Sequence, residues 1–326
     1  MDKNYYDSDL LKIYEKSFRD NWSLPALAEY GSDEVLSYGE MARRIARFHL
    51  FFQQVGLKPG DKVALLGKNS ATWVMCFMAT ITYGATIVPI LADFNARDAQ
   101  HIINHSGSTL LFVNQSLWEP FEYDQMPCVK AVISLETRQV LAERPSKGEN
   151  PVERIIRNLT RRFRSVYKAG FNPEDIKYPD VARDATAVIN YTSGTTGFSK
   201  GVMLTYDNLC GNVVFGARSR LHYEGSRALS FLPLAHAYGC AFDMLVPLAV
   251  GTFVTIFGKA PTPKLLLAAL AKVRPNLVVC VPLILEKIYR KQIVPMITRR
   301  AIRWALAVPF VDGAIYAKIR NRLVEA

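Results

Sequence analysis

The sequence predicts an α/β protein with two parallel-type β-sheet lobes flanked by helices. From about residue 60 onward, short apolar runs alternate with helical patterns. The runs are apolar nearly throughout, which is typical of parallel strands buried on both faces. A charged, proline-containing interval at 143–184 divides this alternation into two batches. We therefore expect a first α/β lobe over approximately 60–185 and a second over 186–326.

The first lobe is predicted to contain strands at 62–66, 85–90, 109–113 and 129–134 and helices over 71–83 and near 97–105. The uncharged run 69–92 is long enough to span a bilayer. Gly84 and Pro89 interrupt it, so it reads better as a buried helix followed by a buried strand. A second long and mostly apolar run, 226–258, is interrupted by Pro233, His236, Asp243, Pro247 and Gly251, and we predict no transmembrane span.

The second lobe is predicted to begin with a strand at 187–191. Thr205 is a suitable N-cap for a helix through Ala217. Strands follow at 228–231 and 252–257 with a helix between them, and then a helix over 263–273, a strand at 277–281 and a helix from Leu283.

Composition limits the classes of protein that fit. The five cysteines are far apart and form no C-x-x-C pair, which favours reduced, mostly buried thiols in a cytoplasmic protein. The polar N-terminus is not a signal peptide. The net charge is +11, but segments 153–168 and 287–326 hold essentially all of it. Such local charge argues against a general nucleic-acid binder.

The basic segment 153–168 has apolar residues at helical spacing, with arginines elsewhere. A basic amphipathic helix of this kind can lie on an anionic membrane, here the inner membrane surface. The alternative, which we favour, is a surface helix that packs its apolar stripe on its own domain.

The stretch "YTSGTTGFSKG", from Tyr191 to Gly201, is rich in hydroxyls and glycine and holds Lys200 near its end. Glycine permits the backbone turns in which several N–H groups converge on an anion, and lysine adds a mobile charge. The stretch is not a Walker A loop, because Lys200 is followed by glycine and a strand-like run rather than by a helix. We expect a polyphosphate-binding loop that joins two strands.

The longer stretch "YTSGTTGFSKGVMLTYDNL" resembles the phosphate loop of the adenylate-forming superfamily, which includes acyl-CoA synthetases, luciferases and nonribosomal adenylation domains. Ser199 stands where the family usually has proline. Residues 36–90 look like the family's opening lobe, and "FLPLAHAYG" at 231–239 looks like its acyl-pocket segment. "VVCVPLILEKIYRK" at 278–291 resembles the long-chain fatty acyl-CoA synthetase branch. The resemblance covers about residues 20–326.

The resemblance implies ATP-dependent activation of a fatty acid to acyl-adenylate and then to acyl-CoA, with ATP, Mg²⁺ and coenzyme A. It places phosphate contacts at Thr192, Ser193, Gly194, Thr195, Thr196, Gly197 and Lys200. Thr192 also matches a position that helps to hold Mg²⁺ in related enzymes. The implied catalytic residues are Lys200 and His236, and the implied acyl-pocket residues are His236, Tyr238, Gly239 and Pro282.

Two of these positions have plainer alternatives. His236 could be a hydrogen-bonded core histidine, and Pro282 could be an ordinary turn residue. His236 is not expected to act as a general base, because a carboxylate nucleophile is already ionised at neutral pH.

Motifs that the family places later in the chain, at the adenine, the ribose and the lid lysine, do not occur here. We therefore expect a truncated N-terminal AMP-binding domain without its C-terminal lid, inactive alone, from a complete fatty acid–CoA ligase. Two alternatives stay open. One is another adenylate-forming ligase, such as a carrier-protein-dependent enzyme, and the other is a non-catalytic nucleotide-binding module.

Overall fold

Two β-sheets organise the chain, in a computed structural model that describes residues 9–144, 151–192, 200–259, 261–294 and 317. The larger sheet has seven strands in the order β7-β6-β5-β3-β4-β8-β9. Its strands are β3 (Lys62–Leu66), β4 (Thr86–Ile90), β5 (Leu110–Val113), β6 (Ala131–Ser134), β7 (Val140–Glu143), β8 (Thr186–Thr192) and β9 (Lys200–Thr205). The five central strands are parallel, and β7 and β9 are antiparallel edge strands.

The smaller sheet has the order β10-β11-β1-β2. Its strands are β1 (Pro25–Glu29), β2 (Val35–Ser37), β10 (Arg227–Ser230) and β11 (Phe253–Ile256). Strands β10, β11 and β1 run parallel, and β2 is antiparallel. The predicted class of two parallel-type sheets flanked by helices is confirmed.

The helices are α1 (Leu10–Asp20), α2 (Tyr38–Gln54), α3 (Ala71–Tyr83), α4 (Ala96–Ser106), α5 (Gln115–Trp118), α6 (Val152–Val166), α7 (Tyr206–Arg218), α8 (Ala237–Cys240), α9 (Val246–Ala249), α10 (Pro263–Val273) and α11 (Pro282–Ile288). π-helical segments at Ala241–Leu245 and Tyr289–Ile293 follow α8 and α11. Thr205 caps α7 as predicted, since its side chain accepts a hydrogen bond from the Asn208 N–H.

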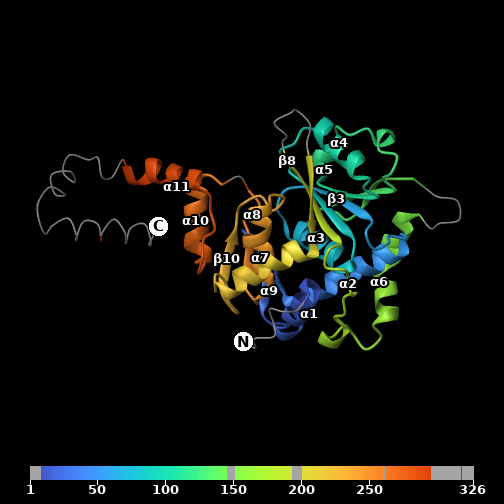
Figure 1. Ribbon diagram of the computed structural model, residues 1–326, viewed down its shortest axis with the longest axis horizontal. Helices are drawn as coiled ribbons and strands as arrows, with labels where there is room; N and C mark the ends of the chain where they lie inside the picture. Colours follow the sequence, from blue (N-terminus) through green and yellow to red (C-terminus); the bar gives the residue numbers. More distant parts are fainter. Residues whose placement is uncertain (1–8, 145–150, 193–199, 260, 295–316, 318–326) are drawn as a thin grey trace, which may run out of the picture.

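Helices and sheets alternate in layers (Figure 1). Helices α1, α2, α3, α7 and α9 share one core with the inner faces of both sheets. Along β3, Val63 and Leu65 point into this core, whereas Ala64 and Leu66 point to the opposite face, which α4 covers. Helix α10 covers the outer face of the smaller sheet. Burial of both faces explains why the strands read as continuous apolar runs.

The two sheets do not coincide with the predicted lobes 60–185 and 186–326. Strands β8 and β9 belong to the larger sheet, and the N-terminal β1 and β2 belong to the smaller one. The predicted strand at 277–281 is wrong, because only Leu277 forms a bridge, with Ala228 of β10. The chain then turns into α11 at Pro282, which has no N–H to continue a ladder.

Helix α6 settles the packing of the basic segment. Its Ile155 and Phe163 are buried in the central core, so the apolar stripe packs on its own domain as favoured from the sequence. Among the described residues, no helix is both long enough and apolar enough to cross a membrane. None of the five cysteines forms a disulfide, and Cys76, Cys210 and Cys240 are buried.

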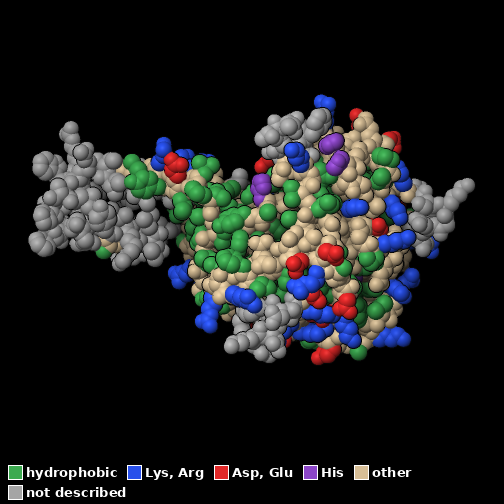
Figure 2. All heavy atoms as spheres, viewed as in Figure 1, with side chains coloured by type: hydrophobic (Ala, Val, Ile, Leu, Met, Phe, Trp, Pro, Cys, Tyr) green, Lys and Arg blue, Asp and Glu red, His purple; other side chains and the backbone are tan. Residues whose placement is uncertain are grey.

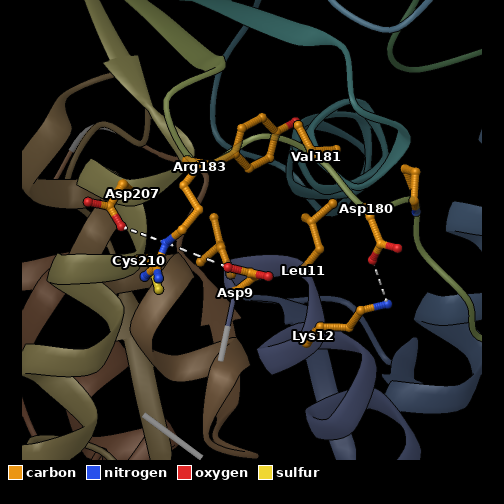
Figure 3. Close-up of a pocket in the computed structure, with 11 residues that line it drawn as sticks. Asp9, Leu11, Lys12, Asp180, Val181, Arg183, Asp207 and Cys210 are labelled. Atoms are coloured by element: carbon orange, nitrogen blue, oxygen red, sulfur yellow. Dashed lines mark hydrogen bonds and ion pairs between the residues drawn. The ribbon is translucent and has the colours of Figure 1, made fainter. Parts of the chain in front are cut away.

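The interval between the two batches of strands is fastened to α1 and α7 around a small hollow (Figure 3). Figure 3 shows the Arg183 side chain between two carboxylates, 3.6 Å from Asp9 and 3.0 Å from Asp207. Beside it, Lys12 forms an ion pair of 3.2 Å with Asp180. These exposed ion pairs connect the interval to α1 and to the start of α7, and each contributes little to stability.

Candidate functional site

The predicted phosphate loop joins two strands, as the sequence indicated. Strands β8 and β9 pair antiparallel, with Thr192 opposite Lys200 at the end of the hairpin next to the connecting loop. The connecting residues, including Ser193, Gly194, Thr195, Thr196 and Gly197, lie outside the described residues. The next helix, α7, begins only at Tyr206, after the whole of β9. Its N-terminus therefore does not directly follow the loop as it would in a Walker motif.

Helix α4 contacts this hairpin next to its connecting loop. Tyr191 is buried, and its hydroxyl lies 2.7 Å from Nδ1 of His105, near the C-terminal end of α4. Burial raises the pKa of Tyr191, so the phenol stays neutral. Gly201 lies opposite Tyr191 on β9, and a Cβ at this position would lie 3.1 Å from the Tyr191 ring. Glycine therefore leaves room for the ring to pack. His105 was not predicted, because its only signal is a contact between distant segments.

The second part of the candidate site is the loop that follows β10. Residues 231–239 contain the acyl-pocket segment expected from the sequence. His236 and Tyr238 are exposed, and Gly239 is buried. A Cβ at Gly239 would lie 2.5 Å from the carbonyl oxygen of Pro233, so the turn closes only around glycine. The exposure of His236 shows that the core-histidine alternative is wrong.

Asn69 joins this loop to the larger sheet. Its side-chain amide donates to the Leu232 carbonyl at 2.7 Å, and its side-chain oxygen accepts from the Leu234 N–H at 3.1 Å. Asn69 follows the end of β3, and the 231–239 loop follows the end of β10. The carboxyl ends of the two sheets therefore meet here. Crevices outside the carboxyl ends of parallel strands are where open α/β sheets bind ligands.

Asp243 supports the same loop from below and was not predicted. It is only 2% exposed, and its Oδ2 accepts a hydrogen bond of 3.3 Å from the Leu232 N–H. Burial raises the pKa of Asp243 to about 7, against the lowering effect of backbone hydrogen bonds from Leu232 and Phe231. The available signal was a lone acid in the otherwise uncharged run 228–258, because a buried acid needs a specific partner.

Pro282 is exposed and begins α11. Its neighbours Cys280 and Ile284 pack against the cluster that contains Phe231 and Leu232, so the structure brings this region beside the 231–239 loop. Figure 2 shows hydrophobic side chains gathered around β10 and α10. Exposed apolar residues of this part of the chain are Leu265, Val278, Val281, Leu283 and Leu285.

The described residues hold no group of three or more His, Cys, Asp or Glu side chains placed to bind a metal ion. A magnesium ion held between Thr192 and the phosphates of a nucleotide would need no such cluster, since Mg²⁺ is commonly bound through few protein ligands and substrate phosphates. The role of Thr192 stays a prediction.

With this geometry described, the sequence can be compared with known proteins. The AMP-binding enzyme family matches residues 15–309. The chain belongs to that family. This AMP-binding chain is 26% identical over 255 residues to a long-chain-fatty-acid–CoA ligase of Salmonella typhimurium, covering 74% of the chain and 45% of the relative. It is 28% identical over 296 residues to the human long-chain-fatty-acid–CoA ligase ACSBG2, covering 85% and 41%.

A third relative, the long-chain-fatty-acid–CoA ligase FadD15 of Mycobacterium bovis, is 31% identical over 255 residues and covers 77% of the chain and 39% of the relative. The AMP-binding chain thus spans less than half the length of these curated relatives.

Solved structures support the fold. The N-terminal domain of FACL13 from Mycobacterium tuberculosis superimposes with a TM-score of 0.69 at 22% identity, over 87% of this chain and 65% of that one. ATP-bound MatB from Rhodopseudomonas palustris gives a TM-score of 0.69 at 20% identity, over 87% of this chain and 52% of that one. At these identities the likeness shows the shared fold.

Proposed function

We propose that this chain supplies the phosphate-binding and acyl-facing walls of a long-chain fatty acid–CoA ligase that uses Mg-ATP and coenzyme A. The observation that carries the proposal is the meeting of two carboxyl sheet ends at Asn69. One end carries the β8–β9 hairpin with Lys200, and the other carries the 231–239 loop. The long-chain ligase relatives support a fatty acid as the substrate.

In the proposed reaction a carboxylate oxygen of the fatty acid attacks the α-phosphorus of ATP, and the bond to pyrophosphate breaks. The thiol of coenzyme A then attacks the acyl carbon, and AMP leaves. The first step brings an anion to a polyanion, so positioning and charge neutralisation dominate it. Lys200 lies next to the connecting loop of the hairpin, where its ammonium group can reach the phosphates. Thr192, opposite it, is the proposed neighbour of Mg²⁺.

The loop after β10 is the proposed acyl-facing wall. Its His236 and Tyr238 are exposed, and the close packing of Gly239 fixes the backbone directly after them. We assign His236 to binding and orienting the carboxylate or adenylate, without removal of a proton. We assign Pro282 to the same wall, because its neighbours Cys280 and Ile284 pack against the cluster that contains Phe231 and Leu232.

ATP–pyrophosphate exchange with palmitate tests the proposal on protein expressed from the complete reading frame. Lys200→Ala should lower the exchange rate about 10²–10³-fold, which is typical for the loss of one group that stabilises transition-state charge. Lys177→Ala, a surface lysine in the linker, is the matched control. Unchanged exchange in Lys200→Ala would refute the assigned role of the hairpin.

The competing functions separate in the same assay. Exchange with palmitate but transfer only to a carrier protein would identify the carrier-dependent ligase. ATP binding without exchange, for every carboxylate in a panel, would identify the non-catalytic module. For the 326-residue chain alone we propose no acyl-CoA formation, and palmitate-dependent exchange by it would contradict that.

A further inference from the structure

A cavity of about 670 Å³ lies between α2, α6 and the β5–β6 part of the larger sheet. This volume is within the range of sites that bind small molecules. Its floor is apolar and largely aromatic, formed by Phe48, Phe51, Met75, Phe112, Ile133 and Ile156. Such a floor suits a hydrocarbon chain.

Arginines line the rest of the cavity. Arg44, Arg47, Arg138 and Arg157 contribute to it, with Glu153 as the one acidic lining residue. Arg157 already pairs with Glu153, and Arg44 pairs with Glu34 outside the cavity. Within the described residues, no ion pair reaches Arg47 or Arg138. The cavity therefore contains two cationic side chains that lack an anion.

Arg47 is the more constrained of the two. Its Nε is buried and has no hydrogen-bond partner, and its guanidinium carbon lies 5.0 Å from the centroid of the Phe163 ring. Burial lowers the pKa of Arg47, and the positive charges of Arg43 and Arg138 lower it further. Holding like charges together with a buried N–H unsatisfied is unfavourable, and a bound anion would relieve both costs.

We propose that this cavity binds a single-chain anionic amphiphile, of the chemical class of a long-chain fatty acid. Its chain would lie on the phenylalanine floor, and its carboxylate or phosphate head between Arg47 and Arg138. Guanidinium groups suit both heads because they donate paired hydrogen bonds to two oxygens. A nucleotide would leave the floor without a chain, and a neutral lipid would leave the arginines unmatched.

The cavity is separate from the candidate active site. In the larger sheet, β3 and β4 stand between β5, which lines the cavity, and β8, which carries the phosphate loop. Three strand spacings correspond to about 14 Å. The cavity also opens on the side of α2 and α6, which pack together at one end of the sheet (Figure 1). The proposal does not depend on the proposed ligase function.

Calorimetric titration of the 326-residue chain with dodecanoate, dodecyl phosphate and uncharged dodecanol tests it. We expect saturable one-to-one binding of at least one of the two anions and much weaker binding of dodecanol. The preferred anion identifies the head group. Equal binding of all three compounds, or saturable binding of none, would overturn the proposal.

Two variants locate the binding determinants. Arg47→Met keeps an apolar stem over Phe163 and removes the charge, and it should weaken anion binding about tenfold. Thr160→Trp adds bulk from an exposed lining position and should block binding although all the arginines remain. Arg154→Gln, exposed on α6 and outside the cavity, is the matched control and should bind as the unmodified chain does. Thermal unfolding of each variant verifies folding.

A photoreactive fatty acid that carries a diazirine on its chain gives an independent readout. We expect crosslinks in peptides that contain 44–51 and 153–160. Crosslinks confined to 231–239 and 282–288 would place the ligand in the proposed acyl wall and overturn a second site. A different result would indicate a membrane-binding surface. In that case the chain would bind anionic vesicles but not the free amphiphile, and Arg154→Gln and Arg47→Met would weaken vesicle binding equally. That result would also overturn the proposed second site.

Discussion

Asp243→Asn tests the electrostatics beneath the 231–239 loop. In the folded chain the Asp243 carboxyl is buried and its pKa is raised to about 7, against 3.8 for the ordinary group. Between these values the folded chain holds the proton and the unfolded chain releases it. Folding then takes up a proton, so the free energy of unfolding must fall as the pH rises. Asparagine keeps the shape and an oxygen for the Leu232 N–H, but it cannot ionise.

The size of the effect follows from the two pKa values. Each unit of difference corresponds to about 1.4 kcal/mol, so the whole contribution is about 4 kcal/mol. It is fully present below pH 3.8 and is lost as the pH rises through 7. Between pH 5 and pH 8 the unmodified chain should lose about 3 kcal/mol of stability from this group alone. Asp243→Asn should lack that loss.

The assay is urea unfolding of both proteins at pH 5, 6, 7 and 8. Groups common to both contribute equally, so the difference between the two curves isolates Asp243. If asparagine replaces the neutral acid without cost, its advantage should be about 1–2 kcal/mol at pH 5 and should grow to about 4 kcal/mol at pH 8. The exposed Asp33→Asn is the control and should follow the unmodified chain. Parallel curves for Asp243→Asn, or a deficit that grows toward pH 8, would show that the ionised carboxylate is well stabilised and would refute the reasoning.

Three further substitutions probe the site's framework. Gly239→Ala places a Cβ 2.5 Å from the Pro233 carbonyl oxygen, so it should lower the free energy of unfolding by about 1–3 kcal/mol; stability equal to that of the unmodified chain would show that the loop relaxes. Gly211→Ala, inside α7 with no atom within 4 Å of the added Cβ, is its counterpart and should stabilise by about 0.5–1 kcal/mol in urea unfolding. Tyr191→Phe removes the hydrogen bond to His105 and should cost about 1 kcal/mol in thermal unfolding; no loss would mean that the bond contributes nothing net.

Much of the β/α framework could be predicted because its signals are local. The helix at 71–83 begins after Ser70, whose hydroxyl accepts a hydrogen bond from Trp73, and ends at Gly84 in the left-handed conformation. Both boundaries are determined by residues adjacent to the helix. The strand at 62–66 is equally clear, because both of its faces are buried.

The parts that were missed depend on distant pairing. Strand β2 has three residues and pairs with β1, which in turn pairs with β11 more than 200 residues later in the chain. Such short segments carry too few residues for a periodic pattern. Conversely, 277–281 looks like a strand from its composition but forms only a single bridge. β-Propensity describes a side chain that suits a sheet and does not supply a partner.

The candidate site divides in the same way. The hairpin that carries Thr192 and Lys200 could be predicted, because its signals lie in one contiguous stretch, and the phosphate role of that stretch stays a prediction. Asn69 could not, since its function here is a contact with Leu232 and Leu234, 163 and 165 residues away. A contact between such distant segments produces no pattern in the sequence from which the contact could be predicted.

The placement of the phosphate loop on a hairpin also bears on how charge is neutralised. In a Walker motif the loop leads into a helix whose dipole favours an anion at its N-terminus. Here the loop leads into β9, and α7 begins a whole strand later, at Tyr206. In the proposed function, Lys200 therefore opposes the triphosphate charge without the help of a helix N-terminus directly after the loop. Tyr191 and His105 hold the hairpin next to the loop without involving Lys200, so removal of the Lys200 charge should affect the rate more than the fold.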